Sequence, residues 1–530
     1  MTQQDNAEQQ SHYGRRQFLR SSLAGAVGVA SGSFLAACGS SASSTTSGAS
    51  SSKPRRGGRL NVGMTGGSST DTLDAHNIVA NTTNVRVLML YEAFVRLDPQ
   101  ARLQPVLAEE MTPNSDATVW TVRLRPDVTF HNGKTLTADD VIFSFQRIMD
   151  PKLALPGAPL VPTIDVAGMR KLDSRTVAIP FKTPFAIFPD VIPSNYFNIV
   201  PVGYDPKIPV GTGAFRYKSF SPAISSTFVR YENYWQSGLP YLDEVIVTDF
   251  PDETSQVNAL ISGQVQAAPE LSTASTTTAR QGGKAVLIDD GGFITPFTMR
   301  VDVPPFNDVR VRQALRAVAN RVQMRELVFG GNGTIGNDIT SIWDPEYDHS
   351  IPQREYDPGL ARYLLKKAGQ EHLTVQLTTS DVAPGCTLAA QVLAQQATAA
   401  GIKINLQQVT PTEFYGPNYL KWAFAQDSWI YASYLPQVSL AFLPKSPFNE
   451  THFNDPSYNK LYNQAVAEVD PARQAELAHE MQLIDYNSGA YIIPYFLPNI
   501  TGLAPNVQNV ERSKPGLPFA NDNVKVIWLS

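Results

Sequence analysis

The stretch from Leu373 to Gln407 constrains the fold of this chain more than any other part of the sequence. It contains a predicted strand over 373–379, a predicted helix over 387–400 that Gly401 stops, and a second predicted strand over 402–407. Two strands joined by a helix in this way lie parallel in one sheet, with a right-handed connection. The sequence therefore predicts a fold of the α/β class.

Three further helices of the second half start at clear capping residues. Asp308, Asp357 and Asp470 are interpreted as N-caps, and proline follows Asp357 and Asp470 at the first helical position. An acidic cap followed by proline is a frequent way to begin a helix, because proline lacks the N–H that would be unsatisfied there. These signals support alternating helices and strands across the second half.

The first half carries weaker but readable signals. Residues 120–124 alternate apolar and polar and predict a half-buried strand. Thr137 and Asp140 resemble a capping box at the start of a helix. Asn84 is interpreted as the cap of another helix, with apolar positions as far as Phe94.

Residues 14–38 have the features of a targeting peptide. Arg15 and Arg16 precede a mildly apolar run, which ends at Cys38 after Leu-Ala-Ala. The arginine pair resembles a twin-arginine export signal. The last four residues resemble a bacterial lipobox, in which cleavage leaves Cys38 first and a diacylglyceryl group is attached to its sulfur. Residues 1–38 are therefore predicted to be an export signal with Cys38 as the lipidation site.

Residues 39–56 are predicted to be a flexible tether, because most of them are Ser, Thr, Gly or Ala and cannot bury apolar area. The mature protein is then a globular body anchored to the outer face of the cell membrane. Cys386 is the other cysteine, so acylation of Cys38 leaves no partner for a disulfide. Cys386 is interpreted as a packed thiol rather than a nucleophile.

Length and charge limit the number of domains and the class of protein to which this chain can belong. A chain of 530 residues is too long for one core and predicts two or three domains in the body. The net charge of -5 is spread without long runs, which argues against a nucleic-acid surface. No second apolar run approaches membrane-spanning length.

Motifs of catalysis and cofactor binding are missing from the sequence. A lone Gly-x-Gly-x-x-Gly at Gly331, Gly333 and Gly336 follows a predicted helix rather than a strand, so a loop is favoured over a dinucleotide site. There is no Walker A motif, no His-Glu-x-x-His and no Gly-x-Ser-x-Gly. The seven histidines include no pair at helical spacing. We therefore expect no catalytic residues, no cofactor and no metal site.

Six short motifs stand along the chain at residues 124–133, 136–141, 209–215, 233–235, 240–243 and 304–315. In sequence and in order they resemble family-5 bacterial solute-binding proteins, the peptide and nickel receptors of ABC importers. The usual Asp-Gly of the first motif is Asn132-Gly133 here. The resemblance runs from about residue 58 to the C-terminus.

The resemblance implies a two-lobed type II periplasmic-binding-protein fold, with an extra domain in the first lobe and a ligand cleft between the lobes. The first lobe is expected to combine three segments, and crossing segments near 295 and 500 are expected to form the hinge. The expected parts of the body are first-lobe segments 57–98, 206–295 and 501–530, the extra domain 99–205, and the second lobe 296–500.

The resemblance also places Trp429 at the border of the cleft. If a strand continues through this segment, Asp427 and Tyr431 share a face with Trp429 and become candidate ligand contacts. Ser69, in the Gly-, Ser- and Thr-rich loop over 65–72, is a further candidate. Without the resemblance, a buried core position is the more common role for such a tryptophan.

Two departures from the family bear on the ligand. Peptide-binding members have an aspartate shortly after the tryptophan, which pairs with the α-ammonium group of the ligand, and Ala432 stands at this position. Burying an ammonium group without a counter-charge is costly, so a free-ended peptide is disfavoured unless another acid such as Asp427 replaces it. Arg300 stands where members often have asparagine. It is either a surface arginine or a contact for a carboxylate or phosphate of the ligand.

The resemblance implies a monomeric, lipid-anchored receptor that delivers a peptide-like or other small polar solute to ABC permease subunits driven by cytoplasmic ATPases. A sensory binding protein without a transport partner is an alternative that adjacent genes would distinguish. A secreted hydrolase is a second alternative, but it requires a nucleophile and base that no motif supplies.

Overall fold

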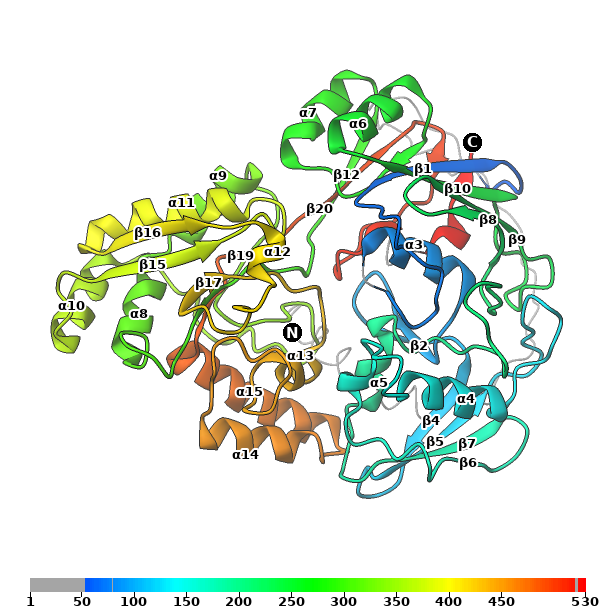
Figure 1. Ribbon diagram of the computed structural model, residues 1–530, viewed down its shortest axis with the longest axis horizontal. Helices are drawn as coiled ribbons and strands as arrows, with labels where there is room; N and C mark the ends of the chain where they lie inside the picture. The colour runs from blue at the N-terminus through cyan, green and yellow to red at the C-terminus, as the bar shows by residue number, and fades with distance from the viewer. Residues whose placement is uncertain (1–52, 79, 520–522) are drawn as a thin grey trace, which may run out of the picture.

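The computed structural model describes residues 53–78, 80–519 and 523–530. Cys38, the export signal and residues 39–52 of the predicted tether lie outside the described residues. Figure 1 shows two lobes side by side, with a smaller domain below the first lobe. Each lobe contains a sheet with helices, so the predicted two-lobed α/β fold is confirmed. No described helix is both long and apolar enough to cross a membrane.

The first lobe is built on a seven-stranded sheet in the order β12-β20-β11-β1-β10-β9-β8. Its strand β1 is parallel to both neighbours, and its apolar residues Leu60, Val62 and Met64 are fully buried. The elements of this lobe are β1 (Arg59–Thr65), α3 (Asn81–Leu90), β8 (Phe215–Ser221), β9 (Ser225–Arg230), β10 (Glu244–Phe250), α6 (Glu253–Ser262), β11 (Ala267–Ala268), α7 (Thr273–Gln281), β12 (Ala285–Asp289) and β20 (Asn499–Leu503). Two short strands, β21 (Val507–Gln508) and β22 (Trp528–Leu529), and the 3-10 turn η4 (Val524–Val526) follow at the C-terminus.

Helix α3 ends where a glycine loop packs against it. A side chain at Gly211 would place its Cβ atom 2.0 Å from the carbonyl oxygen of Leu90, and one at Gly213 would lie 2.4 Å from that of Met89. Only glycine fits so close an approach of two backbones. This contact accounts for the glycines of the 209–215 motif, and it fixes the end of α3 beside the loop.

The extra domain contains a four-stranded antiparallel sheet in the order β4-β5-β7-β6. Trp120, Val122 and Leu124 lie on its buried face, as the alternation of the sequence predicts. The capping box of Thr137 and Asp140 is present at the start of α4. The elements of this part are β2 (Val95–Leu97), β3 (Leu103–Pro105), β4 (Ala108–Pro113), β5 (Val119–Leu124), α4 (Ala138–Ile148), η1 (Ala158–Leu160), β6 (Arg170–Lys171), β7 (Thr176–Pro180), α5 (Phe188–Val191) and η2 (Ile192–Ser194).

The second lobe has a five-stranded sheet in the order β16-β15-β17-β13-β18. Strands β15 (Thr374–Thr379) and β16 (Lys403–Gln408) are parallel, and α11 (Cys386–Ala397) connects them, so the predicted strand-helix-strand unit is confirmed. The remaining elements are β13 (Phe297–Met299), α8 (Val309–Ala317), α9 (Arg321–Phe329), β14 (Thr334–Ile335), α10 (Pro358–Ala368), η3 (Thr398–Ala400), α12 (Pro411–Phe414), β17 (Phe424–Gln426), α13 (Tyr434–Ala441), α14 (Pro456–Ala465), α15 (Pro471–Ser488), β18 (Tyr491–Ile492) and β19 (Tyr495–Phe496).

The predicted N-caps of the second lobe are confirmed. The side chain of Asp308 accepts a hydrogen bond from the backbone N–H of Arg310, and that of Asp357 accepts one from Leu360. Asp470 caps α15 in the same way. Each cap satisfies backbone donors of the first turn that have no partner inside the helix.

The chain passes between the lobes twice, after β12 and before β20. The two passages run together, because β12 and β20 are antiparallel neighbours and the N–H of Leu497 donates to the carbonyl of Phe293 at 2.8 Å. The extra domain also contacts the second lobe, where the N–H of Ala186 donates to the carbonyl of Val466 at 2.6 Å. The first and second lobes are therefore joined at the crossing strands and through the extra domain (Figure 1).

Candidate functional site

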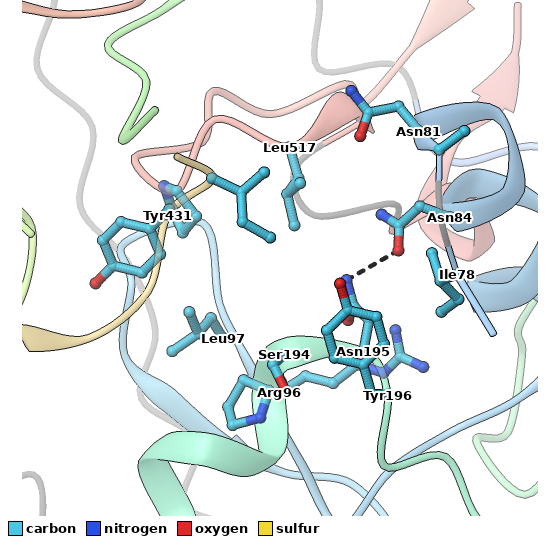
Figure 2. Close-up of a pocket in the computed structure, with 14 residues that line it drawn as sticks. Ile78, Asn81, Asn84, Arg96, Leu97, Ser194, Asn195, Tyr196, Tyr431 and Leu517 are labelled. Atoms are coloured by element: carbon cyan, nitrogen blue, oxygen red, sulfur yellow. Dashed lines mark hydrogen bonds between the residues drawn. The ribbon is translucent and has the colours of Figure 1, made fainter. Parts of the chain in front are cut away.

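A cavity of about 340 Å³ lies where the first lobe, the extra domain and the second lobe meet. Figure 2 shows the residues that line it. They come from the start of α3, from β2, from the turn after α5, from the segment after β17 and from the C-terminal segment. The lining residues are Ile78, Ala80, Asn81, Asn84, Arg96, Leu97, Pro193, Ser194, Asn195, Tyr196, Ile430, Tyr431, Pro515 and Leu517.

Helix α3 supplies two amides, Asn81 and Asn84, which lie one turn apart on the same face. The Nδ2 group of Asn81 donates a hydrogen bond to the carboxyl of Glu270, so its oxygen faces the cavity (Figure 2). Burial raises the pKa of Glu270 to about 7, although the bond from Asn81 opposes this shift. The first lobe thus presents a carbonyl oxygen rather than a charge to the cavity.

The extra domain supplies the turn over 193–196. Asn195 has a left-handed backbone with φ of 67°, which asparagine tolerates better than most residues. Its Nδ2 group donates to Oδ1 of Asn84 at 3.0 Å, the bond drawn in Figure 2. The hydroxyl oxygen of neighbouring Ser194 is buried and has no hydrogen-bond partner among the described residues. This turn therefore connects the extra domain to α3 and leaves a hydroxyl group for a ligand.

The second lobe reaches the cavity through Ile430 and Tyr431. Strand β17 ends at Gln426, so the condition for Asp427, Trp429 and Tyr431 to share one strand face is not met. An isolated bridge from Trp429 to Ile294 holds the segment instead. The side chain of Ile430 is half exposed, and burial raises the pKa of Tyr431 well above its usual value. Tyr431, a predicted ligand contact, lines the cavity, whereas Trp429 is not among the lining residues.

Trp429 and Asp427 instead meet a third residue, Glu450. The indole Nε1 of Trp429 donates to Oε1 of Glu450 at 3.1 Å. Asp427 is almost fully buried and accepts hydrogen bonds from the hydroxyl groups of Tyr415 at 2.8 Å and Tyr419 at 3.0 Å. Burial, the charge of Asp427 and a hydrogen bond with Asp427 raise the pKa of Glu450 well above its usual range.

Desolvation and the neighbouring carboxyl group of Asp427 both disfavour the charged form of Glu450. The hydrogen bond from Nε1 to Glu450 holds the indole of Trp429 in place. Phe448 flanks the ring at 6.0 Å between centroids, and its side chain is partly exposed. The result is an aromatic surface of Trp429 and Phe448 next to Ile430, on the second lobe.

The other sequence candidates lie elsewhere. The guanidinium group of Arg300 forms an ion pair with Asp302 at 2.6 Å and donates to the carbonyl of Lys421 at 3.1 Å. Ser69 is exposed in the turn after β1 and is not among the lining residues. Cys386 is a buried thiol, and burial raises its pKa to about 12. Among the described residues, no three His, Cys, Asp or Glu side chains are grouped so that they could hold a metal ion.

The comparisons with known proteins agree on a family. The family model described as bacterial extracellular solute-binding proteins, family 5 middle, matches residues 102–454. The glutathione-binding protein GsiB of Pectobacterium atrosepticum is 25% identical over 445 residues, covering 78% of this chain and 84% of that protein. The probable di/tripeptide-binding protein 5 of Pseudomonas aeruginosa is 26% identical over 452 residues, covering 78% and 85%.

A solved structure supports the fold independently of close sequence identity. The ABC transporter substrate-binding protein CtaP of Listeria monocytogenes superimposes with a TM-score of 0.77 at 18% identity, covering 90% of this chain and 100% of that chain. The type II periplasmic-binding-protein fold that the sequence resemblance implies is thereby confirmed.

Proposed function

This chain belongs to the bacterial extracellular solute-binding proteins of family 5, and we propose that it captures a small solute outside the cytoplasm and delivers it to an ABC permease. Two relatives are named for glutathione and for di- and tripeptides, which supports a peptide-like or other small polar solute here. Binding closes the two lobes on the solute, and the permease recognises the closed state.

The observation that carries this proposal is the composition of the cavity wall. Asn81 belongs to the first lobe, Asn195 to the extra domain and Tyr431 to the second lobe, and all three line one cavity. A site divided among separate parts is complete only when these parts approach each other, so a solute that contacts all of them favours the closed arrangement. The crossing strands β12 and β20 supply the hinge for that motion.

Small-angle scattering tests the closure. Native mass spectrometry of protein purified from its own source first identifies the solute that it carries. Adding this solute to the stripped protein is expected to reduce the radius of gyration, because the lobes approach each other. An unchanged scattering profile at a saturating concentration would contradict closure as the mode of binding.

We further propose that a lipid on Cys38 anchors the protein to the outer face of the cell membrane. The acyl chains would hold it there, since each buried methylene contributes about 0.8 kcal/mol. In cells that express Cys38→Ser, fractionation is expected to show the protein lost from the membrane fraction, while the wild type needs detergent for release. A wild-type protein that is recovered without detergent would exclude the anchor.

A further inference from the structure

The cavity offers a ligand very little charge. Among the described residues that line it, Arg96 is the only one that carries a charge at neutral pH. Its guanidinium group donates to the carbonyl oxygen of Tyr91 at 2.6 Å and to Oδ1 of Asn198 at 3.5 Å. Burial raises the pKa of both Tyr196 and Tyr431, so their phenol groups are neutral. The guanidinium group of Arg96 is therefore already hydrogen-bonded to other groups of the protein.

Half of the wall is apolar, contributed by Ile78, Ala80, Leu97, Pro193, Ile430, Pro515 and Leu517. The rest is made of amide and hydroxyl groups and the guanidinium group of Arg96. Asn81 presents its carbonyl oxygen, and the hydroxyl of Ser194 is buried without a partner in the part of the chain that the structure describes. A ligand that fills this space needs apolar surface and a few hydrogen-bonding groups that match an amide oxygen and a hydroxyl group.

The carboxyl group of Glu270 lies near the cavity, but the side-chain amide of Asn81 lies between the two. Glu270 accepts the hydrogen bond from Nδ2 of Asn81 and is not among the lining residues. Asp427 and Glu450 are likewise absent from the wall, and Asp427 is occupied by two tyrosine hydroxyls. An ammonium group in the cavity would therefore lose its water without gaining a carboxylate, which is costly.

We propose that the cavity binds an uncharged, largely apolar part of the solute that carries amide-type hydrogen-bonding groups, and that it discriminates against a free ammonium group there. The proposal rests on the solute-binding function above and names the chemical class of the solute. An end-blocked peptide or another neutral amide fits this class, and a free-ended peptide does not.

Two matched probes test the proposal by calorimetric titration. They are N-acetyl-leucyl-phenylalanine amide and leucyl-phenylalanine amide, which differ in whether the amino end is acetylated or a free ammonium group. The blocked probe is expected to bind the full-length protein about tenfold tighter or more, since tenfold corresponds to about 1.4 kcal/mol. Equal affinity, or tighter binding of the free-amine probe, would overturn the proposal.

A charge placed in the wall gives a second, independent readout. Asn81→Asp is isosteric. One oxygen of its carboxylate accepts a hydrogen bond from the protonated carboxyl group of Glu270, in place of the bond that the amide donates, and the other faces the cavity. The variant is therefore expected to raise the affinity for the free-amine probe relative to the blocked probe by about tenfold. Asn506→Asp adds the same charge at an exposed position outside the wall and is expected to leave the ratio unchanged. Because the readout is a ratio, a general loss of folded protein does not produce it. An unchanged ratio in Asn81→Asp would contradict the proposal.

The scattering experiment distinguishes failure of this inference from failure of the proposed function. If the carried solute closes the lobes but neither dipeptide probe binds, the proposed chemical class is wrong and the solute-binding function stands. If the carried solute also leaves the scattering unchanged, the proposed function itself fails.

Discussion

Replacing Asp338 by asparagine is expected to lower the free energy of unfolding by about 3–5 kcal/mol, the range found when one partner of a buried ion pair is removed. The carboxylate of Asp338 is fully buried in the second lobe. Both of its oxygens accept hydrogen bonds from Arg321, at 2.6 and 2.7 Å, and one also accepts from Nε of Arg354 at 2.8 Å. Arg316 lies 3.7 Å away. Asparagine keeps the shape but leaves these guanidinium groups without their counter-charge.

The pKa of Asp338 determines how the stability difference between the wild type and Asp338→Asn changes with pH. Burial opposes ionisation of Asp338, yet the charges of Arg321, Arg316 and Arg354 outweigh it and lower the pKa below 3.8. Since the folded pKa lies below the unfolded one, the stabilisation is complete above the unfolded value. It is lost as the pH falls through the folded value. The difference between wild type and variant is therefore expected to shrink in acid.

Thermal and denaturant unfolding of both proteins at neutral pH and in acid measure this difference. The matched control is Asp302→Asn, which removes the partner of Arg300 at the surface, where the Asp302 side chain is 42% exposed. Surface pairs contribute about 0–1 kcal/mol, so the control is expected to change little. If both variants unfold at the wild-type midpoint, the buried cluster does not stabilise the lobe as described.

Local patterns predicted the parts of the fold that depend on neighbouring residues. The strand-helix-strand unit over 373–407, the acidic caps of α8, α10 and α15, and the buried face of β5 each follow from spacing within one short segment. Periodicity and capping are properties of such segments, and they survive in the tertiary structure when no distant contact competes with them.

Helix α3 shows where a distant contact does compete. The sequence predicts Asn84 as the cap of this helix, but α3 begins at Asn81 and ends at Leu90, so Asn84 lies inside it and Phe94 lies beyond it. The side chain of Asn84 accepts its bond from Asn195, 111 residues away, and the loop at Gly211 sets the end of the helix. Neither contact leaves a signal in the local sequence, because each depends on how separate domains pack.

The residues of the candidate site also differ in whether a local signal in the sequence predicts them. The family resemblance points to the segment around Trp429, and Tyr431 is a candidate in it only through a strand that does not continue. Asn81 and Ser194 belong to segments with no motif of their own. Glu450 could not be predicted as the partner of Trp429, because the two meet only through the packing of the loop after β17. The sequence therefore indicates the segment of the second lobe that lines the cavity. The lining residues of the first lobe and of the extra domain are known only from the structure.

Trp429→Ala is expected to weaken binding of the carried solute roughly thirtyfold or more, since truncating an aromatic anchor in a desolvated site costs about 2 kcal/mol or more. The indole lies directly before Ile430 and Tyr431, which line the cavity, and Glu450 fixes its orientation. We propose that the ring extends the cavity wall and stacks against the solute. Calorimetric titration of wild type and variant measures the change.

A second tryptophan provides the control for stability. Trp120 is a core residue of the extra domain, 4% exposed, and its indole N–H donates to the carbonyl of Phe185 at 3.0 Å. Trp120→Ala is expected to cost roughly 3–5 kcal/mol of stability and to spare the affinity of the protein that remains folded. Trp429→Ala is expected to show the opposite balance, because its half-buried ring gives up less packing on truncation. If Trp429→Ala instead lowers the melting temperature as much as Trp120→Ala and leaves the affinity unchanged, the ring is a core residue. The second lobe then contributes to binding only through Ile430 and Tyr431.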